Sequence, residues 1–145
     1  MSATGLEVFD TTVQKTMTWL KDIMDELHWE DRHRAYLGLR GCLHLLRDRL
    51  SVEEVAHLGA QLPMLVRGIY YEGWDPTHNP SRERTAAEFA GGLVDYFPEE
   101  GRQDYERVMS GCLHVMSRHV DPGITRHVRG VMPRSIADLW QEELV

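Results

Sequence analysis

Four histidines are the residues whose type and spacing come closest to a metal-binding pattern. His44 and His57 lie at equal distances on either side of an expected helix-to-helix turn at residues 50 and 51. In an antiparallel hairpin they would stand at about the same height, and His114 and His127 repeat the arrangement later in the chain. Imidazole nitrogens are good ligands for divalent ions. If the two pairs met, they could form a four-nitrogen site for zinc or iron.

The same histidines also have a structural interpretation, in which each one hydrogen-bonds across its own hairpin and has been inherited twice. A histidine that binds a metal usually donates its second N–H group to a carboxylate or a carbonyl. The candidate carboxylate, Asp48, corresponds to Arg118 in the second half of the chain, so it is not duplicated. This difference favours the structural interpretation and leaves metal binding as the alternative.

Two Glu-x-x-His segments, Glu30 to His33 and Glu54 to His57, have the spacing found in di-iron helical bundles. Such a site needs two further carboxylates pointing inward at mid-helix. Glu54 is already expected in a helix cap, and its counterpart in the second half is Ile124. The di-iron interpretation is therefore the weaker of the two metal hypotheses.

An aromatic cluster with a neighbouring arginine is the strongest indication of a binding surface. Tyr70, Tyr71 and Trp74 follow Arg67, and Trp, Tyr and Arg are enriched in the residues that dominate protein interfaces. We therefore expect these four residues to contact a protein partner or a second copy of the chain. The alternative is that the rings close a seam between the two halves, since Trp140 stands at the position equivalent to Tyr70.

Motifs for catalysis are lacking in the sequence. Cys42 and His44 lie two positions apart on an expected helix, so their side chains point in different directions. Gly91 and Gly92 do not belong to a glycine-rich phosphate loop. We expect a protein that is not an enzyme and binds no cofactor. An enzyme with a site between the halves is a third hypothesis, which would require a concave pocket with convergent polar groups.

All these residues lie in a sequence that repeats itself at an offset of 70 residues. Gly-Cys-Leu-His at residues 41–44 returns at residues 111–114, and the correspondence continues without a gap. Further equivalent pairs are His57 and His127, Leu62 and Met132, Pro63 and Pro133, Val66 and Ile136, and Tyr70 and Trp140. Such self-similarity indicates an internal duplication, here of residues 10–74 and 80–144.

Three helices are expected in the first half from apolar residues that recur at steps of three and four. The first, capped by Asp10, Thr11 or Thr12, would bury Val13, Met17, Leu20, Met24 and Leu27. The second would run from Asp31 to Leu50 with Tyr36, Leu39, Leu43 and Leu46 on its buried stripe. Ser51-x-x-Glu54 is a capping box that starts the third helix. Pro63 should kink that helix or restart it.

The second half should contain three more helices: one ending at Phe97, one over residues 103–120, and one from Pro122 to about residue 142 that bends at Pro133. No useful alternation of period two occurs, so the fold class is all-α with about six helices. A three-helix unit of this size has a marginal core. We therefore expect two tandem three-helix repeats that pack around a local pseudo-two-fold axis, forming one domain over residues 1–145.

Composition narrows the classes of partner and the compartment. The 145-residue chain carries a net charge of −7, which argues against nucleic acid and against an anionic membrane surface. Arg47 and Arg49 stand among acidic residues and are typical of a mixed, solvated face. No apolar run is long enough to span a membrane. Cys42 and Cys112 should be reduced, core-facing thiols, so we expect a soluble cytoplasmic protein.

The stretch from Leu46 to Trp74 resembles a bacterial family, domain-of-unknown-function family 2267. The residues that carry the likeness are Leu46-Arg47-Asp48-Arg49-Leu50, Glu53-Glu54, His57-Leu58, Ala60-Gln61-Leu62-Pro63, Arg67-Gly68, Tyr70-Tyr71 and Gly73-Trp74. The second half resembles the family more weakly. The resemblance implies a small, helical, soluble bacterial protein and supplies no activity or catalytic residue. From the residues themselves, we expect a non-catalytic module that binds a protein partner or itself.

Overall fold

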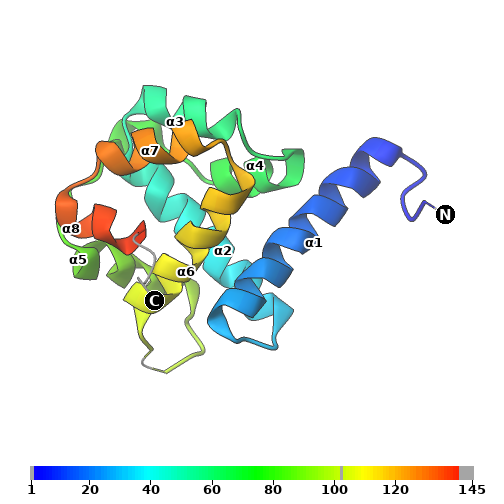
Figure 1. Ribbon diagram of the computed structural model, residues 1–145, viewed down its shortest axis with the longest axis horizontal. Coiled ribbons are helices and arrows are strands. Elements are labelled where there is room, and N and C mark those ends of the chain that lie inside the picture. The colour runs from blue at the N-terminus through cyan, green and yellow to red at the C-terminus, as the bar shows by residue number, and fades with distance from the viewer. Residues whose placement is uncertain (1, 102, 141–145) are drawn as a thin grey trace.

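The computed structural model describes residues 2–101 and 103–140 of the chain, and every statement on structure refers to these residues. They form eight α-helices and three short 3-10 helices and contain no β-strand, which confirms the all-α prediction (Figure 1). In chain order the elements are α1 (Glu7–Leu27), α2 (Arg32–Arg49), α3 (Val52–Gly59), α4 (Met64–Tyr71), η1 (Pro76–His78), α5 (Ala86–Gly91), η2 (Gly92–Tyr96), α6 (Tyr105–His119), α7 (Pro122–Gly130), α8 (Arg134–Ala137) and η3 (Asp138–Trp140).

The helix starts follow local chemistry that is visible in the sequence. The expected capping box is present at α3, where Ser51 Oγ accepts from Glu54 N at 3.3 Å and Glu54 Oε1 accepts from Ser51 N at 3.0 Å. Asp31 caps α2 in the expected place by accepting from His33 N at 2.9 Å. The expected start of α1 is wrong, because this helix begins at Glu7 and Asp10 lies in its first turn.

Both prolines end one helix and precede the next. Pro63 is the N-cap of α4 and Pro133 is the N-cap of α8, each with an extended ψ near 150° (154° and 147°). Proline cannot donate to the preceding turn, so the chain restarts. These two breaks, and the transition from α5 to η2 at Gly91 and Gly92, divide the six expected helices into the larger observed number.

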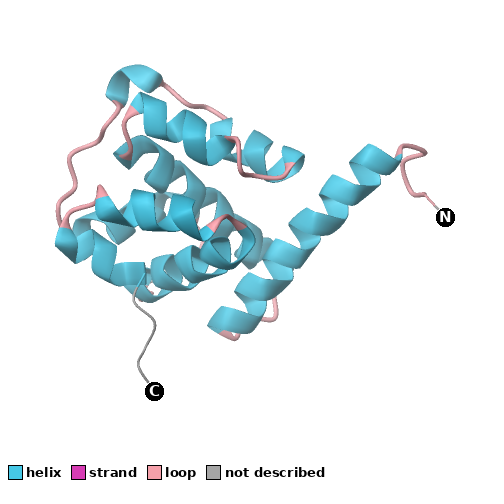
Figure 2. Ribbon diagram, turned by 45° about the horizontal axis from the view of Figure 1, so that its top comes forward, coloured by secondary structure: helices cyan, strands magenta, loops and turns pink. Residues whose placement is uncertain are grey.

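The core forms where α2 and α6 contact each other and both contact α1. α3 lies beside α7 at the top of Figure 1, and α5 lies beside α8. The C-terminal half of α1 packs into this core, whereas its N-terminal half projects away from the rest of the molecule in both Figure 1 and Figure 2. None of the described helices combines the length and apolar composition that crossing a lipid bilayer requires.

The buried face of α1 differs from the expected one. Its buried residues are Thr12, Thr16, Trp19, Leu20, Ile23 and Leu27. Val13 and Met17, which were expected in the core, keep 44% and 36% of their surface exposed. The prediction is wrong for these two residues because the helix turns its two threonines toward the molecule.

Two glycines allow the central helices to approach neighbours from the other half of the chain. A Cβ atom on Gly41 of α2 would lie 2.6 Å from Leu93 Cδ2 and 3.0 Å from Tyr96 Cγ. A Cβ atom on Gly111 of α6 would lie 2.6 Å from Leu27 Cδ2 of α1. Any side chain at these positions would have to push its neighbours aside, so the close packing depends on glycine.

Candidate functional site

His44 uses both of its ring nitrogens inside the protein. Its Nε2 lies 2.6 Å from the carbonyl oxygen of Ile69 and therefore donates, and its Nδ1 lies 3.0 Å from the Tyr96 hydroxyl. Burial is the main cause of the lowered pKa of His44. A neutral ring with both nitrogens engaged has no lone pair free for a metal ion.

The other three histidines of the predicted metal site lie in separate surroundings. His114 Nε2 is 3.0 Å from the carbonyl oxygen of Trp140, and His127 Nε2 is 3.1 Å from Glu54 Oε2. His57 is exposed on α3. Within the described ranges, no three His, Cys, Asp or Glu side chains form a group that could hold a metal ion. The structure does not bring the four imidazoles together, and it assembles neither Glu-x-x-His segment into such a group.

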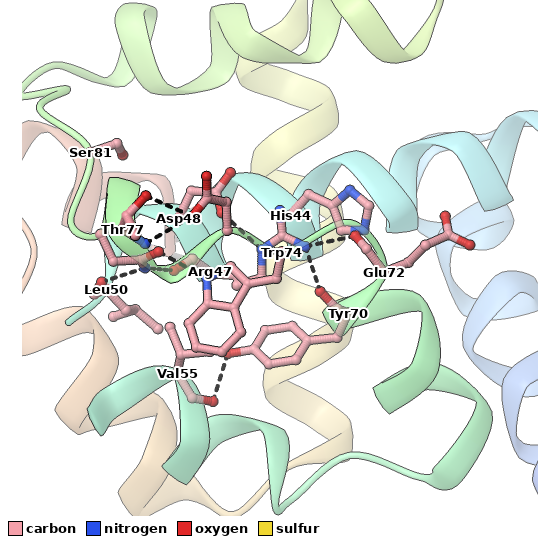
Figure 3. Close-up of polar contacts among 12 residues, drawn as sticks. His44, Arg47, Asp48, Leu50, Val55, Tyr70, Glu72, Trp74, Thr77 and Ser81 are labelled. Carbon is pink, nitrogen blue, oxygen red and sulfur yellow. Dashed lines mark hydrogen bonds and ion pairs between the residues drawn. The ribbon is translucent and has the colours of Figure 1, made fainter. Parts of the chain in front are cut away.

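The predicted aromatic cluster is real, but much of it faces inward. Tyr70 is 0% exposed, and its hydroxyl donates to the carbonyl oxygen of Val55 at 2.9 Å (Figure 3). The ring of Tyr71 packs against Tyr70 and Trp74, with centroid distances of 4.9 and 5.7 Å. Trp74 Nε1 donates to Asn79 Oδ1 at 2.8 Å. These rings join α3, α4 and the loop with η1, all from the first half of the chain.

Arg67 stabilises the turn between α3 and α4. Its guanidinium donates to the carbonyl oxygens of Gly59 at 2.9 Å and Leu62 at 2.8 Å, although part of the residue is exposed. Tyr70 is too deeply buried to contact a partner directly. Partner contacts by Arg67, Tyr71 and Trp74 stay a prediction.

Arg47 is the residue of this region that sequence reasoning misjudged. It was expected on a solvated face, yet it is 5% exposed. Its Nη1 donates to the carbonyl oxygens of Tyr70 at 2.9 Å and Glu72 at 3.0 Å, and its Nε donates to Asp48 Oδ1 at 2.8 Å (Figure 3). The sequence did contain an indication that Arg47 is buried, since it lies one helical turn after Leu43, which was expected in the core.

The loop that follows α4 is held onto the end of α2 by the same region. Asn79 Nδ2 donates to the carbonyl oxygens of Arg47 at 2.7 Å and Leu50 at 2.8 Å. Ser81 N donates to the carbonyl oxygen of Asp48 at 2.7 Å. Residues 70–81 are thus bonded to the end of α2 and do not form an open binding loop.

A polar groove of about 890 Å³ lies between the C-terminal end of α1 and α6. Its volume is in the range of small-molecule sites. The residues that line it are Glu26, Leu27, His28, Asp104, Glu106, Arg107, Ser110, Gly111, His114 and Arg118. This groove has the concave shape that the enzyme hypothesis requires.

Several polar side chains of this groove are already paired with one another or with backbone. Ser110 Oγ donates to the carbonyl oxygen of Leu139 at 2.6 Å, while His114 bonds to that of Trp140, so the serine and the histidine do not form a nucleophile–base pair. Glu26 Oε1 accepts from Arg118 at 3.0 Å. Arg107 donates to the carbonyl oxygen of Leu27 at 2.9 Å. The geometry gives no activated nucleophile.

A cluster of exposed apolar side chains, which we call the α1–α4 patch, covers the projecting end of the molecule. Of the ten exposed large hydrophobic side chains in the described residues, seven lie on α1, its N-cap or α4. They are Leu6, Val8, Phe9, Val13, Met17, Met64 and Leu65. The sequence pattern did not reveal this patch, because Val13 and Met17 were assigned to the core.

The patch has a fixed shape because α4 is tied to α1. Thr12 Oγ1 accepts a hydrogen bond from Leu65 N at 2.9 Å, which holds the start of α4 against α1. A shallow groove of about 480 Å³ runs beside this bond, lined in part by Val8, Pro63 and Met64. The exposed side chains are thus presented by two helices that are joined to each other.

The two cysteines are buried and unbonded, as expected. The contact with the Cys112 thiol, followed by burial, raises the pKa of Cys42 well above its usual range. Reactive thiols have lowered pKa values and are accessible. Cys42 therefore has the setting of a packing residue rather than a nucleophile.

Comparison with known proteins identifies a family and no activity. A family model described as an uncharacterized conserved protein, DUF2267, matches residues 16–139. A search of curated proteins finds no match to the chain. The matched range contains the core helices and the groove, and it begins after most of the projecting part of α1.

Proposed function

This chain belongs to the DUF2267 family of uncharacterized conserved proteins, and we propose that it is a non-catalytic module that binds protein through the α1–α4 patch. The concentration of seven of the ten exposed large hydrophobic side chains in this patch carries the proposal. Single exposed apolar residues are ordinary on a protein surface, but a contiguous group marks an interaction site.

The physical gain comes from removing these side chains from water. Complete burial of a Leu, Val, Phe or Met side chain contributes roughly 1.5–3 kcal/mol. A helix such as α1 gains most from a partner that covers its exposed face, because its first turns project from the body of the molecule (Figure 2). Protein is favoured over nucleic acid as the partner, since the chain carries a net charge of −7. We propose a cytoplasmic setting for the same module.

Contacts between equivalent residues of the two halves support a duplicated architecture. At the offset of 70, the contact of Gly41 with Tyr96 corresponds to the contact of Gly111 with Glu26, with the halves exchanged. The equivalent residues Cys42 and Cys112 touch each other. These paired contacts support two repeats related by a local two-fold axis.

The comparison of the two repeats singles out the start of α1. The first helix of the second repeat, α5, begins at Ala86, which corresponds to Thr16. Residues 7–15 of α1 therefore have no α-helical counterpart, although residues 7 and 8 correspond to the end of η1. An extra helical segment that buries only Thr12 and exposes Val8, Phe9 and Val13 supports a role in binding rather than in folding.

The metal-binding and enzymatic alternatives have less support. A metal site at His44, His57, His114 and His127 would need those side chains to leave separate positions and give up their present hydrogen bonds. An enzyme in the polar groove would need a nucleophile that is not bonded to backbone.

Photo-crosslinking in the native host tests the proposal. A benzophenone amino acid at Phe9 should give a defined protein adduct, because Phe9 lies within the patch. The same group at Val131, an exposed apolar residue outside the patch, serves as the matched control and should give none. Failure of the Phe9 probe to form any protein adduct, or equal adducts at both positions, would contradict the proposed function.

A further inference from the structure

We infer that the occupant of the α1–α4 patch is a second copy of this chain, with the two α1 helices paired antiparallel and crossing at Val13. This inference rests on the proposed function and specifies the partner for that surface. It assigns the stripe Leu6, Phe9, Val13 and Met17 as the contact between copies.

The stripe has the spacing of a helix–helix contact. Its members recur at steps of three, four and four, which places them along one side of α1. Each remains at least 36% exposed, although the rest of α1 buries a conventional core face. The helix therefore has two apolar faces, one used by its own molecule and one left for a partner.

The stripe is complementary to itself. In a symmetric dimer the same surface of both copies forms the interface. With Val13 on the two-fold axis, Phe9 of one copy lies opposite Met17 of the other, because both are four residues from Val13. An aromatic ring and a flexible thioether side chain pack well together.

The charges of α1 favour the antiparallel orientation. Within residues 5–21, which overlap when the two helices cross at Val13, Glu7 and Asp10 precede Val13, whereas Lys15 and Lys21 follow it; the acidic residues 22, 25 and 26 lie beyond the overlap. Antiparallel pairing brings the acidic side of this overlap in one copy beside the basic side in the other, and it also opposes the two helix dipoles. Parallel pairing would bring like charges together.

The position of α1 in the molecule also favours this arrangement. The N-terminal half projects from the body in both views, so a second helix can lie alongside it (Figures 1 and 2). In an antiparallel pair, the bodies attached to the C-terminal halves lie at opposite ends of the contact. A parallel pair would force the two bodies to occupy the same side.

Disulfide scanning on the full chain tests the inference. The variants are Phe9→Cys, Val13→Cys and Met17→Cys, with Val131→Cys as an exposed control for random collision. The oxidant is diamide, which is reduced as it takes two hydrogens from a pair of thiols. The wild type should give no covalent dimer, because Cys42 and Cys112 are buried.

The antiparallel dimer predicts a specific pattern of covalent dimers. Val13→Cys should cross-link at least tenfold faster than Val131→Cys, whereas Phe9→Cys and Met17→Cys should each cross-link slowly alone and rapidly when mixed. Rapid cross-linking of Phe9→Cys and Met17→Cys by themselves would overturn the antiparallel orientation. If Val13→Cys cross-links no faster than the control, the inference that the partner is a second copy of the chain is overturned. A Phe9 photo-adduct with a different protein would in that case leave the proposed function standing.

Discussion

Arg47 shows how one buried cation can fix a loop that looked like a binding surface. Its guanidinium donates to the carbonyl oxygen of Tyr70, in the last turn of α4, and to that of Glu72, its C-cap, where carbonyl groups lack a partner within the helix. Its own carbonyl oxygen accepts from Asn79. The aromatic residues around it are consequently held in place by bonds within the molecule.

Replacing Arg47 should therefore reduce stability more than an ordinary arginine substitution. Arg47→Met leaves the Tyr70 and Glu72 carbonyl oxygens without their donor, and hydrogen bonds to charged groups contribute roughly 1.5–3 kcal/mol each. We expect a loss of about 3 kcal/mol in the free energy of unfolding, measured by urea denaturation. Arg82→Met, at an exposed arginine nearby, should change it by no more than about 0.5 kcal/mol. Equal losses in both variants would contradict the role of Arg47.

His44 should make stability depend on pH in a predictable direction. Burial lowers its pKa from the usual 6.5, with smaller effects of Arg47 and Arg40 in the same direction; the bond to the Ile69 carbonyl and the charge of Asp48 oppose the shift. Below pH 6.5 the unfolded chain then binds more protons at this residue than the folded chain does. Folding is therefore weakened as the pH falls through that range.

The measurement is the free energy of unfolding across this pH range in the wild type and in His44→Gln. The glutamine side chain can still donate to Ile69 and accept from Tyr96, but it does not titrate. We expect the wild type to lose more stability than the variant as the pH falls below 6.5. An identical pH dependence in both proteins would show that His44 does not titrate as described.

At the scale of single elements, α2 depends on close contact with η2 at Gly41. Ala in place of Gly41 would bring a methyl group within 3.0 Å of the Tyr96 ring, which is also held by His44. Overpacking of this kind costs about 1–3 kcal/mol, more than the gain of about 1 kcal/mol in helix propensity. Gly41→Ala should lower the thermal midpoint.

Gly68 provides the matched control for this substitution. It lies in α4, and a Cβ atom there would meet nothing within 4 Å. Gly68→Ala should raise stability by about 0.5–1 kcal/mol, because alanine has the better helix propensity. The two variants should thus shift the melting temperature in opposite directions. A stabilising effect of Gly41→Ala would refute the close packing of α2 on η2.

Most of the elements were predictable because their ends are set by local chemistry. The Ser51 and Glu54 capping box, the cap at Asp31 and the restarts at Pro63 and Pro133 depend on neighbouring residues alone. The apolar stripes of α2 and α6 also agree between the two halves of the sequence. A helix is easy to predict when its capping residues and its apolar pattern indicate the same boundaries and the same buried face.

The rotation of α1 was not predictable from the same pattern. Thr12 and Thr16 are polar by type, but both are buried with their hydroxyl groups hydrogen-bonded, Thr16 to the carbonyl oxygen of Thr12 at 2.7 Å and Thr12 to Leu65 N. A buried hydroxyl with a partner carries little penalty. Apolar periodicity therefore pointed to Val13 and Met17, and the candidate interaction site was missed for the same reason.

At the scale of the whole molecule, the polar groove marks where the two halves of the sequence differ. Beside α2, the Tyr96 hydroxyl bonds to His44, and the guanidinium of Arg40 lies 5.4 Å from the centroid of the Tyr96 ring. Beside α6, the positions 70 residues away from Tyr96 and Arg40 carry Glu26 and Ser110. These two side chains are smaller than Tyr96 and Arg40, so they fill less of the space beside α6, where the groove lies.

The extension of α1 is the second large difference between the halves, and it carries the proposed interaction. Residues 7–15 lengthen α1 beyond the start of α5 and place the exposed stripe outside the core. The family match begins at residue 16, so most of the stripe lies outside the matched range. Association through α1 is consequently expected of this chain and of relatives that share its extension.

Sedimentation velocity over a wide range of concentration tests the central claim most directly. The wild type and the control Val131→Glu should shift with concentration from the 16.8 kDa of one chain toward twice that mass. The double variant Phe9→Glu, Met17→Glu should remain at 16.8 kDa throughout, because it places charges in the stripe. A wild type that stays at the mass of one chain at every concentration, or a double variant that associates as strongly as the wild type, would contradict self-association through α1.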